Sequence, residues 1–429
     1  MDKIKSKYFL SLLLCLAFGT LMAQEDYYDQ STIRYTDYIY KSTIHTPLIN
    51  KLGFELSYPF VQLNSNDTLM IQFDDFETNP QNYYFTIIHC DKDWNPSPLS
   101  FTDYAEGFND NPITEYLFSF NTLQHYIHYQ FTIPNENIKL KLSGNYLALI
   151  HENDQSKPVL SLRFFVYEPL TQITAKVHRA TLAEYMKTSQ EIDFTLNNSF
   201  PCFNPFGEIS VIVSQNFRFD NVLRDLKPQF VKDNELFYNY EEGNLFEGGS
   251  EFRWVDAKSI RYQTERVQQI TYISPAYHFI MLPDEKQTFK VYFQWQDING
   301  RFLIKNSMGE DSRIEADYVY IHFFLPYDIP LSEGNLYIAG NFNHWQYTKE
   351  NMLKYNYDRK GYELTLYLKQ GFYDYAYAFM SDTSKAADFG FIEGNHYETE
   401  NDYYIFVYWK NNSSRYDHLT GIISVNSMR

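Results

Sequence analysis

Residues Tyr83 to Trp94, with the sequence YYFTIIHCDKDW, decide the fold of the first part of the chain. The segment begins with aromatic and β-branched residues, which favour strands. Side chains alternate between the two faces of a strand, and here both alternating sets are apolar. A strand with two apolar faces is expected in the centre of a sheet that is covered on both sides. We therefore predict a doubly buried central strand that ends at the polar turn beginning at Asp91.

The rest of the chain has the composition of an all-β protein. Of its 429 residues, 19% are aromatic, and 39 Tyr and 36 Phe supply most of them. Short alternating apolar runs, such as Thr288–Trp295, are separated by single Gly and Pro residues, and no long run has helical periodicity. This pattern predicts tandem immunoglobulin-like β-sandwiches. We expect an N-terminal sandwich over 24–168, a middle sandwich with a long excursion over 169–315, and a C-terminal sandwich over 316–429.

The first 23 residues have the features of a secretory signal peptide. Three lysines between Lys3 and Lys7 precede an apolar run from Phe9 to Leu21, and Ala23 is a small residue at a plausible cleavage point. The apolar run is too short to span a membrane comfortably. We expect residues 1–23 to be removed during export.

The formal net charge of −18 limits the classes of partner that the protein can bind. The chain has 54 acidic and 36 basic residues, and its signal segment is basic, so the exported part is still more acidic. Such a chain is not expected to bind nucleic acid or anionic lipid through a basic patch. We also expect no transmembrane span in the exported protein, because no second apolar segment of spanning length follows the first.

Two cysteines, Cys90 and Cys202, follow the signal segment. An oxidising compartment would permit a disulfide between them. Their positions in different predicted sandwiches favour two buried free thiols instead.

Residue types that could bind a metal occur at two places, but their spacing fits no metal site. His151–Asp154 lies where a hairpin turn is expected. Asp91–Asn95 resembles the start of a calcium loop, but Pro96 stands at the sixth position, where such loops need Gly. We therefore expect no metal and no cofactor.

The sequence also gives little reason to expect an enzyme. His89 is followed directly by Cys90, and strand alternation places the two side chains on opposite faces, where they cannot act on one substrate. The chain contains no G-x-S-x-G, no H-E-x-x-H and no phosphate-binding glycine loop. Its many carboxylate pairs are expected by chance among 54 acidic residues.

The C-terminal region resembles the glycogen-binding immunoglobulin-like modules of the E-set type. The residues that carry this resemblance are Gly340–Trp345 (GNFNHW) and Leu368–Gly371 (LKQG), with the aromatic strand that follows. In that family, the tryptophan at the position of Trp345 stacks on a sugar face. The resemblance implies an alternative function, a carbohydrate-binding outer-membrane accessory protein with Trp345 as its platform.

A second resemblance extends over nearly the whole exported chain, to the plug protein family of the type IX secretion system. The matching residues are His89, Cys90, Trp94, Gly107, Phe108, Tyr116, Ser119, Asn121, Thr122, His128, Tyr129, Leu142–Tyr146, Trp295, Asp297, Asn299, Gly300, Asp317–Val319, Leu368–Gly371, Glu398–Asn401 and Arg415–Asp417.

This second resemblance implies a periplasmic, non-enzymatic protein at the inner face of the outer membrane. Its partner would be a very large outer-membrane translocon barrel, whose periplasmic opening it would occlude when no substrate is being exported. The long connection Asn95–Thr122 and the excursion Asn216–Thr271 are the segments that we expect to contact this barrel.

Overall fold

The predicted central strand is β5 (Tyr84–Cys90), and it lies inside a six-stranded sheet. The computed structural model describes residues 32–384 and 386–428, so the expected signal segment lies outside the described residues. In this sheet β5 pairs with β11 (Gly144–His151) and with β7 (Asn111–Pro112). The strands β12 (Pro158–Tyr167), β1 (Tyr38–Ile39) and β3 (Phe60–Gln62) complete the sheet. The prediction of a central strand is confirmed.

A second sheet covers one face of β5 and completes the first sandwich. It has the order β2 (Ile44–Lys51), β4 (Leu69–Asp75), β9 (Ile127–Ile133) and β8 (Glu115–Phe118). Phe85 and Ile87 of β5 pack into the core between the two sheets. Two short strands, β6 (Ala105–Gly107) and β10 (Ile138–Leu140), and the short helix α2 (Phe101–Tyr104) lie beside this core.

The second sandwich is built from two parts of the chain that are far apart in sequence. One sheet contains β13 (Thr171–Arg179), β14 (Ser189–Asn198), β17 (Phe230–Lys232), β18 (Glu235–Tyr238) and β19 (Leu245–Glu247). The other has the order β16 (Val222–Leu223), β15 (Ile209–Gln215), β29 (Asp402–Trp409) and β30 (His418–Asn426). The short helix α3 (Pro205–Glu208) precedes β15. The last two strands of the chain therefore close this second sandwich.

The third sandwich is formed by the residues between β19 and β29. One sheet consists of β20 (Arg253–Asp256), β23 (Phe302–Ile304), β25 (Gly334–Ala339) and β28 (Gly371–Ser381). The other has the order β21 (Val267–Ile273), β22 (Ala276–Met281), β24 (Tyr318–Pro326), β27 (Gly361–Lys369) and β26 (Lys354–Asn356). The short helices are α4 (Ser312–Glu315), η1 (Asn341–Asn343) and α5 (Gly390–Glu393).

This topology differs from the predicted division into 169–315 and 316–429. The third sandwich is an insertion in the second, and the strands predicted to close the C-terminal unit pair with β15 instead. The reason is a non-local pairing, in which Val211 and Val213 of β15 lie opposite Val407 and Ile405 of β29. Alternation along one strand identifies its buried face but does not identify its partner.

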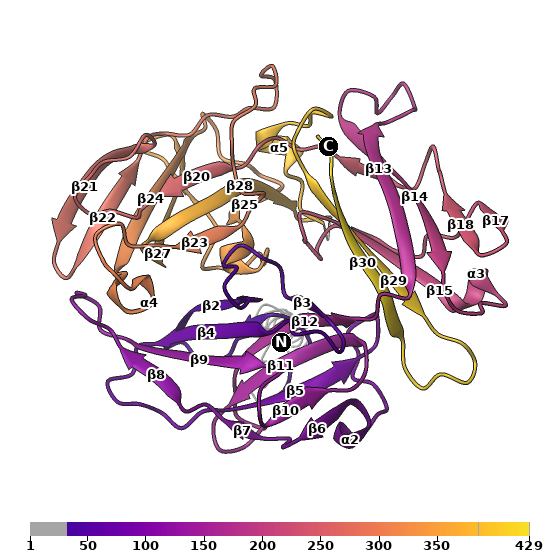
Figure 1. Cartoon of the computed structure of the whole chain (residues 1–429). Coiled ribbons are helices and arrows are strands. Elements are labelled where there is room, and N and C mark those ends of the chain that lie inside the picture. The colour runs from indigo at the N-terminus through magenta and orange to yellow at the C-terminus, as the bar shows by residue number, and fades with distance from the viewer. Residues whose placement is uncertain (1–31, 385, 429) are drawn as a thin grey trace, which may run out of the picture.

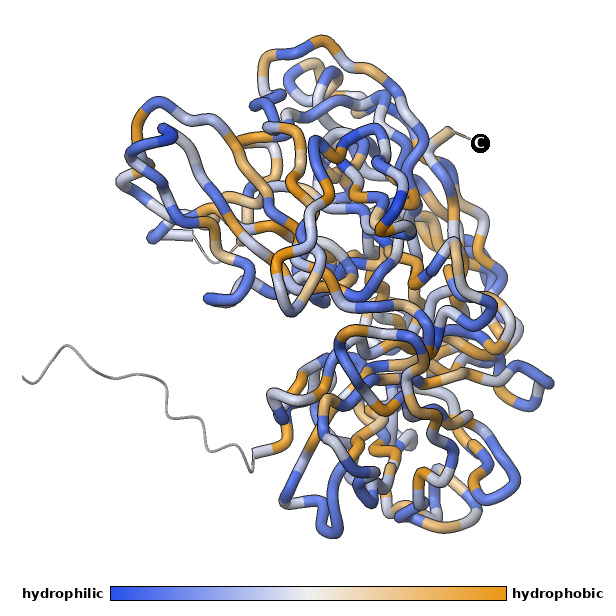
Figure 2. Tube along the Cα trace, turned by 90° about the vertical axis from the view of Figure 1, so that its left-hand side faces the viewer, coloured by the Kyte–Doolittle hydropathy of each residue, from blue (hydrophilic) through white to orange (hydrophobic). Residues whose placement is uncertain are grey.

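The all-β prediction is confirmed, since the described residues form three packed sandwiches and only short helices. Figure 1 shows the first sandwich below the other two, with the yellow strands β29 and β30 beside β15. Figure 2 shows hydrophilic and hydrophobic residues alternating along much of the trace, as expected for strands with one covered face. No helix in the described part of the chain is long and apolar enough to cross a membrane.

Candidate partner-binding surfaces

The first and second sandwiches share an aromatic interface, which explains the second apolar face of β5. Ile88, Cys90 and Phe165 belong to a buried cluster with Phe406 and other residues of the second sandwich. The ring centroids of Phe165 and Phe406 are 4.8 Å apart. This interface therefore covers the sheet face that the first sandwich does not cover itself.

The first and third sandwiches meet at a buried ionic cluster. The Lys369 Nζ atom lies 2.6 Å from the Asp74 carboxylate, and both side chains are at most 2% exposed. Tyr318 donates a hydrogen bond to the same carboxylate at 2.7 Å, and His128 Nδ1 lies 2.8 Å from its other oxygen. Burial alone would raise the pKa of Asp74, but Lys369 and His128 outweigh burial and hold it below its usual value. Asp74 is therefore a charged partner inside the interface.

The second and third sandwiches meet around Trp345. The Arg218 guanidinium lies over the Trp345 ring at 4.7 Å and over the Phe389 ring at 4.0 Å. The Cη2–Cζ2 edge of the indole approaches Gly300, where a Cβ atom would come within 2.5 Å of the ring. Trp345 is only 6% exposed. A sugar platform needs an accessible ring face, so the expectation that Trp345 presents such a platform is wrong.

Both cysteines in the described residues are free thiols, as predicted. Cys90 is buried and Cys202 is partly buried, and burial raises the pKa of each thiol to about 12. The thiolate is the reactive form of cysteine, so neither residue has the properties of a nucleophile. His89, on the opposite face of β5 from Cys90, makes a hydrogen-bonding contact of 3.1 Å with the carbonyl of Ser143.

The two segments with metal-ligand residue types, Asp91–Asn95 and His151–Asp154, make hydrogen bonds and ion pairs within the protein. Asp91 Oδ1 accepts hydrogen bonds from the backbone N–H groups of Asp93 and Asn95, which closes a tight turn. His151 Nε2 lies 3.2 Å from the Asp110 carboxylate, and its Nδ1 lies 2.7 Å from the carbonyl of Glu152.

One group with metal-ligand residue types, not predicted from the sequence, consists of His178, Glu191 and Asp193. Their ligand atoms lie within 4.8 Å of one another because β13 and β14 pair His178 with Glu191. The sequence could have indicated this group only if the pairing register of the β13–β14 hairpin had been known. Burial lowers the pKa of His178, but its hydrogen bond to Asp193 and the neighbouring carboxylates outweigh burial and raise it. A raised pKa favours a protonated ring paired with Asp193, whereas a metal ligand must be neutral.

Exposed apolar side chains lie in both segments that we expected to contact a partner. In the connection 95–122, Phe108, Phe118 and Phe120 are 57% to 67% exposed. In the excursion 216–271, Phe230 and Tyr262 are 59% and 67% exposed.

A third exposed apolar surface was not predicted as a contact site. It is the segment Thr288–Trp295, for which sequence analysis predicted a strand. The segment pairs with no strand in the described part of the chain. Phe289, Val291 and Phe293 are 94%, 93% and 72% exposed.

Two buried carboxylates hold the turn that follows this segment. Asp374 Oδ2 accepts hydrogen bonds from the N–H groups of Ile298 and Gly300 at 2.7 and 3.2 Å. Asp297 Oδ2 accepts one from the N–H of Phe252 at 2.6 Å. Burial and the proximity of Asp297 raise the pKa of Asp374 to about 8, and burial raises that of Asp297 to about 6. The two carboxylates that hold this turn therefore have pKa values close to neutral pH, because they are buried.

Comparison with known proteins relates the first sandwich to a secretion system. Residues 44–168, which include every strand of the first sandwich except β1, match the family model of the type 9 secretion system plug protein 1st domain. The chain belongs to the type 9 secretion system plug protein family. The predicted family resemblance is thereby confirmed.

The relatives of known structure include one that matches over the whole architecture. The crystal structure of a hypothetical protein from Parabacteroides merdae ATCC 43184 has 31% sequence identity and a TM-score of 0.89. The match covers 92% of this chain and 100% of that chain. The C-terminal domain of the antigen I/II-family protein AspA of Streptococcus pyogenes is 8% identical over 89% of this chain and 99% of that chain. Its TM-score is 0.16, so it supports no structural argument. No curated protein matches the sequence significantly.

Proposed function

We propose that this protein is a non-enzymatic periplasmic plug of the type IX secretion system. It occludes the periplasmic opening of the giant outer-membrane translocon barrel when no substrate is being exported. The observation that carries this proposal is family membership together with three sandwiches joined through buried interfaces.

Occlusion requires a body that keeps its shape against a large opening. The aromatic cluster around Phe165, the ion pair between Asp74 and Lys369, and the stacking of Arg218 on Trp345 join each pair of sandwiches. Separating the first and third sandwiches would break both the Asp74–Lys369 ion pair and the hydrogen bond from Tyr318 to Asp74. The three sandwiches are therefore expected to move as one body.

Binding to a barrel requires an accessible surface, and the edge strand β8 supports this role. All four residues of β8 are exposed, and the rings of Tyr116 and Phe118 lie edge to face with their centroids 5.9 Å apart. Phe120, just beyond the strand, is 60% exposed. The N–H of Phe120 donates a hydrogen bond to the carbonyl of Ile314 at 2.9 Å, which connects this edge to the third sandwich. Aromatic residues are enriched at the centres of protein interfaces. We propose the surface around β8 as the barrel contact.

The proposal is tested by purification of the tagged protein from outer membranes in mild detergent. We expect a very large barrel protein to co-purify in stoichiometric amount. The double variant F118S/F120S should lose this partner, while the variant F203S should retain it. Phe203 is a suitable control because it is 91% exposed and lies in the second sandwich. Recovery of the wild-type bait alone, from membranes that contain the barrel, would contradict the proposal.

A further inference from the structure

His178, Glu191 and Asp193 bring three metal-ligand atoms together on one face of the hairpin formed by β13 and β14. His178 lies directly opposite Glu191 in the hairpin register, and Asp193 is two residues further along β14, on the same face. The Nε2 atom of His178 lies 3.0 Å from Asp193 Oδ2 and 3.9 Å from Glu191 Oε1. One ligand atom from each residue lies within 4.8 Å of the other two. A metal ion that binds its ligands at about 2.0–2.4 Å can therefore contact all three.

The imidazole of His178 is held with one nitrogen facing both carboxylates. Its Nδ1 atom lies 2.8 Å from the backbone carbonyl of Arg179. A carbonyl oxygen can only accept a hydrogen bond, so Nδ1 carries a hydrogen atom, and the neutral ring has its lone pair on Nε2. Metal-binding histidines usually have this arrangement, in which the other ring nitrogen donates to a carbonyl or a carboxylate.

Both carboxylates are also positioned by hydrogen bonds from the surrounding chain. The N–H of Thr181 donates to Glu191 Oε2 at 2.7 Å, and the amide of Asn244 donates to Asp193 Oδ1 at 3.2 Å. Glu191 is only 2% exposed. Its Oε1 atom, the one nearer to His178, accepts no hydrogen bond from the described residues. An oxygen of a buried carboxylate without a donor is unfavourable unless a cation compensates its charge.

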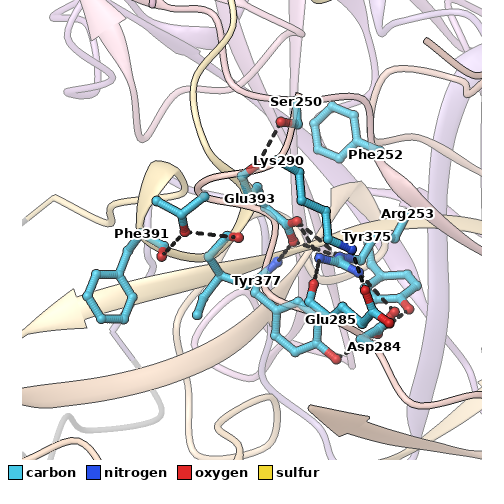
Figure 3. Close-up of polar contacts among 12 residues, drawn as sticks. Ser250, Phe252, Arg253, Asp284, Glu285, Lys290, Tyr375, Tyr377, Phe391 and Glu393 are labelled. Atoms are coloured by element: carbon cyan, nitrogen blue, oxygen red, sulfur yellow. Dashed lines mark hydrogen bonds and ion pairs between the residues drawn. The ribbon is translucent and has the colours of Figure 1, made fainter. Parts of the chain in front are cut away.

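Elsewhere in the molecule, a cluster of buried carboxylates is neutralised by the chain itself. Figure 3 shows this cluster, in which Arg253 pairs with Glu393 at 2.8 Å and with Asp284 at 3.0 Å. Within the described residues, by contrast, no Lys or Arg forms an ion pair with Glu191 or Asp193. The hairpin carboxylates therefore differ from this cluster in having no permanent cationic partner.

A proton on His178 compensates only part of the charge of this group. Two carboxylates and one protonated imidazole leave one negative charge. Lys176 lies opposite Asp193 in the hairpin, but it is exposed and forms no ion pair with it. A divalent ion bound to two carboxylates and a neutral imidazole leaves no net charge. Metal binding would therefore replace the proton of His178 and balance both carboxylates.

The ligand types and their separations indicate which metal the group would bind. Ligands of tetrahedral Zn²⁺ lie about 3.4 Å apart when each is about 2.1 Å from the ion. The separations from His178 Nε2, 3.0 and 3.9 Å, lie on either side of this value. An imidazole ligand favours zinc and its first-row neighbours, whereas Ca²⁺ and Mg²⁺ prefer oxygen ligands. The side chains of His178 and Asp193 are partly exposed, so a water molecule can take the fourth position.

We infer that His178, Glu191 and Asp193 form a binding site for one Zn²⁺ ion or a similar first-row divalent metal ion. The ion links β13 to β14 and keeps one coordination position open to water. The site lies in the second sandwich, whereas the proposed barrel contact around β8 lies in the first. The inference therefore does not rest on the plugging role.

Isothermal titration calorimetry of the full exported chain tests this inference. The protein carries no polyhistidine tag, is first treated with EDTA and then freed of the chelator, and ZnCl₂ is the titrant. We expect saturable binding of one Zn²⁺ per chain and no measurable binding of Ca²⁺. Co²⁺ should bind at the same site, show the visible absorption of a tetrahedral complex, and be displaced by Zn²⁺.

Three variants locate the bound ion. H178A and E191Q should each weaken Zn²⁺ binding roughly tenfold or more, because each removes one of three ligands. E191Q keeps a side-chain oxygen for the N–H of Thr181, so it tests the site even if H178A does not fold. The matched control is H322A, because His278 Nδ1 and His322 Nε2 lie 2.8 Å apart in the third sandwich. This variant should bind Zn²⁺ as the wild type does.

Thermal denaturation gives a second measurement. A ligand that binds only the folded state stabilises it, so Zn²⁺ should raise the melting temperature of the wild type and H322A but not that of E191Q. No binding of Zn²⁺ by the wild type would overturn the inference. Binding that H322A abolishes and E191Q does not would overturn it in favour of the other histidine pair. Equal binding by all variants would show an adventitious ion only and would overturn it as well.

Discussion

The ammonium group of Lys369 lies 2.6 Å from the carboxylate of Asp74, and the pair is almost completely buried between the first and third sandwiches. Asp74 is in β4 and Lys369 is at the end of β27, so the contact joins residues 295 positions apart. The interface that it stabilises is central to the account of the molecule as one rigid body.

Removal of one member of this pair should destabilise the protein strongly. We expect K369M to lower the free energy of unfolding by about 3–5 kcal/mol, because it leaves a buried carboxylate without its cation. Urea denaturation measures this change. The control is E363Q, which removes the exposed ion pair with Arg359 and should cost less than about 1 kcal/mol. Equal, small effects of the two variants would show that the buried pair does not hold the interface.

The buried carboxylate of Asp374 should make stability depend on pH. Its pKa is about 8 in the folded protein and near 4 when unfolded, so the folded state binds the extra proton between these values. Stability from this group is therefore lost as pH rises from 4 to 8, by at most about 1.4 kcal/mol per pH unit.

The variant D374N tests this sign. Asp374 Oδ1 has no hydrogen-bond partner in the described chain, so an amide nitrogen can occupy its position without facing a donor. We expect D374N to gain stability relative to the wild type as pH rises from 6 to 8, measured by urea denaturation at each pH. A constant difference over this range would mean that Asp374 is ionised throughout.

The two free cysteines should be unreactive in the folded protein. Burial raises the pKa of both Cys90 and Cys202 to about 12, so few thiolates are present at pH 8. We expect iodoacetamide to label neither residue in native conditions and both in urea, as read by peptide mass spectrometry. Rapid native labelling of Cys90 would contradict the packing of β5 against the second sandwich.

Trp345 should contribute to stability rather than to sugar binding. W345A removes a ring that packs against Gly300 and Arg218, and we expect it to lower the free energy of unfolding by about 3–5 kcal/mol. Thermal and urea denaturation measure the change. The wild-type protein should not be retained on a glucan column, and retention that W345A abolishes without loss of stability would contradict this assignment.

The sequence predicted the positions of individual strands well, but it predicted poorly which strands pair with one another. Alternation located β5, β29 and β30, because strand faces follow from the order of residues. Alternation also showed that both faces of β5 are buried. It did not show that one of these faces packs against Phe406 and its neighbours in the second sandwich. It missed the insertion of the third sandwich, because the pairing of β15 with β29 depends on contacts almost 200 residues apart.

The candidate sites were also predicted incompletely, because their environment depends on residues far away in the sequence. The pattern at Thr288–Trp295 predicted a strand, but the segment pairs with no strand in the described residues. The motif that contains Trp345 indicated an exposed ring, whereas Arg218 from the second sandwich covers it. Burial that depends on a neighbouring domain leaves no periodic signal in the sequence.

The most direct test of the plugging role is the electrical conductance of the purified translocon barrel in a planar bilayer. The account predicts large open-channel currents from the barrel alone and their closure when this protein is added to the periplasmic side. The F118S/F120S variant should fail to close the channel at the same concentration. Undiminished current in the presence of saturating wild-type protein would contradict the account.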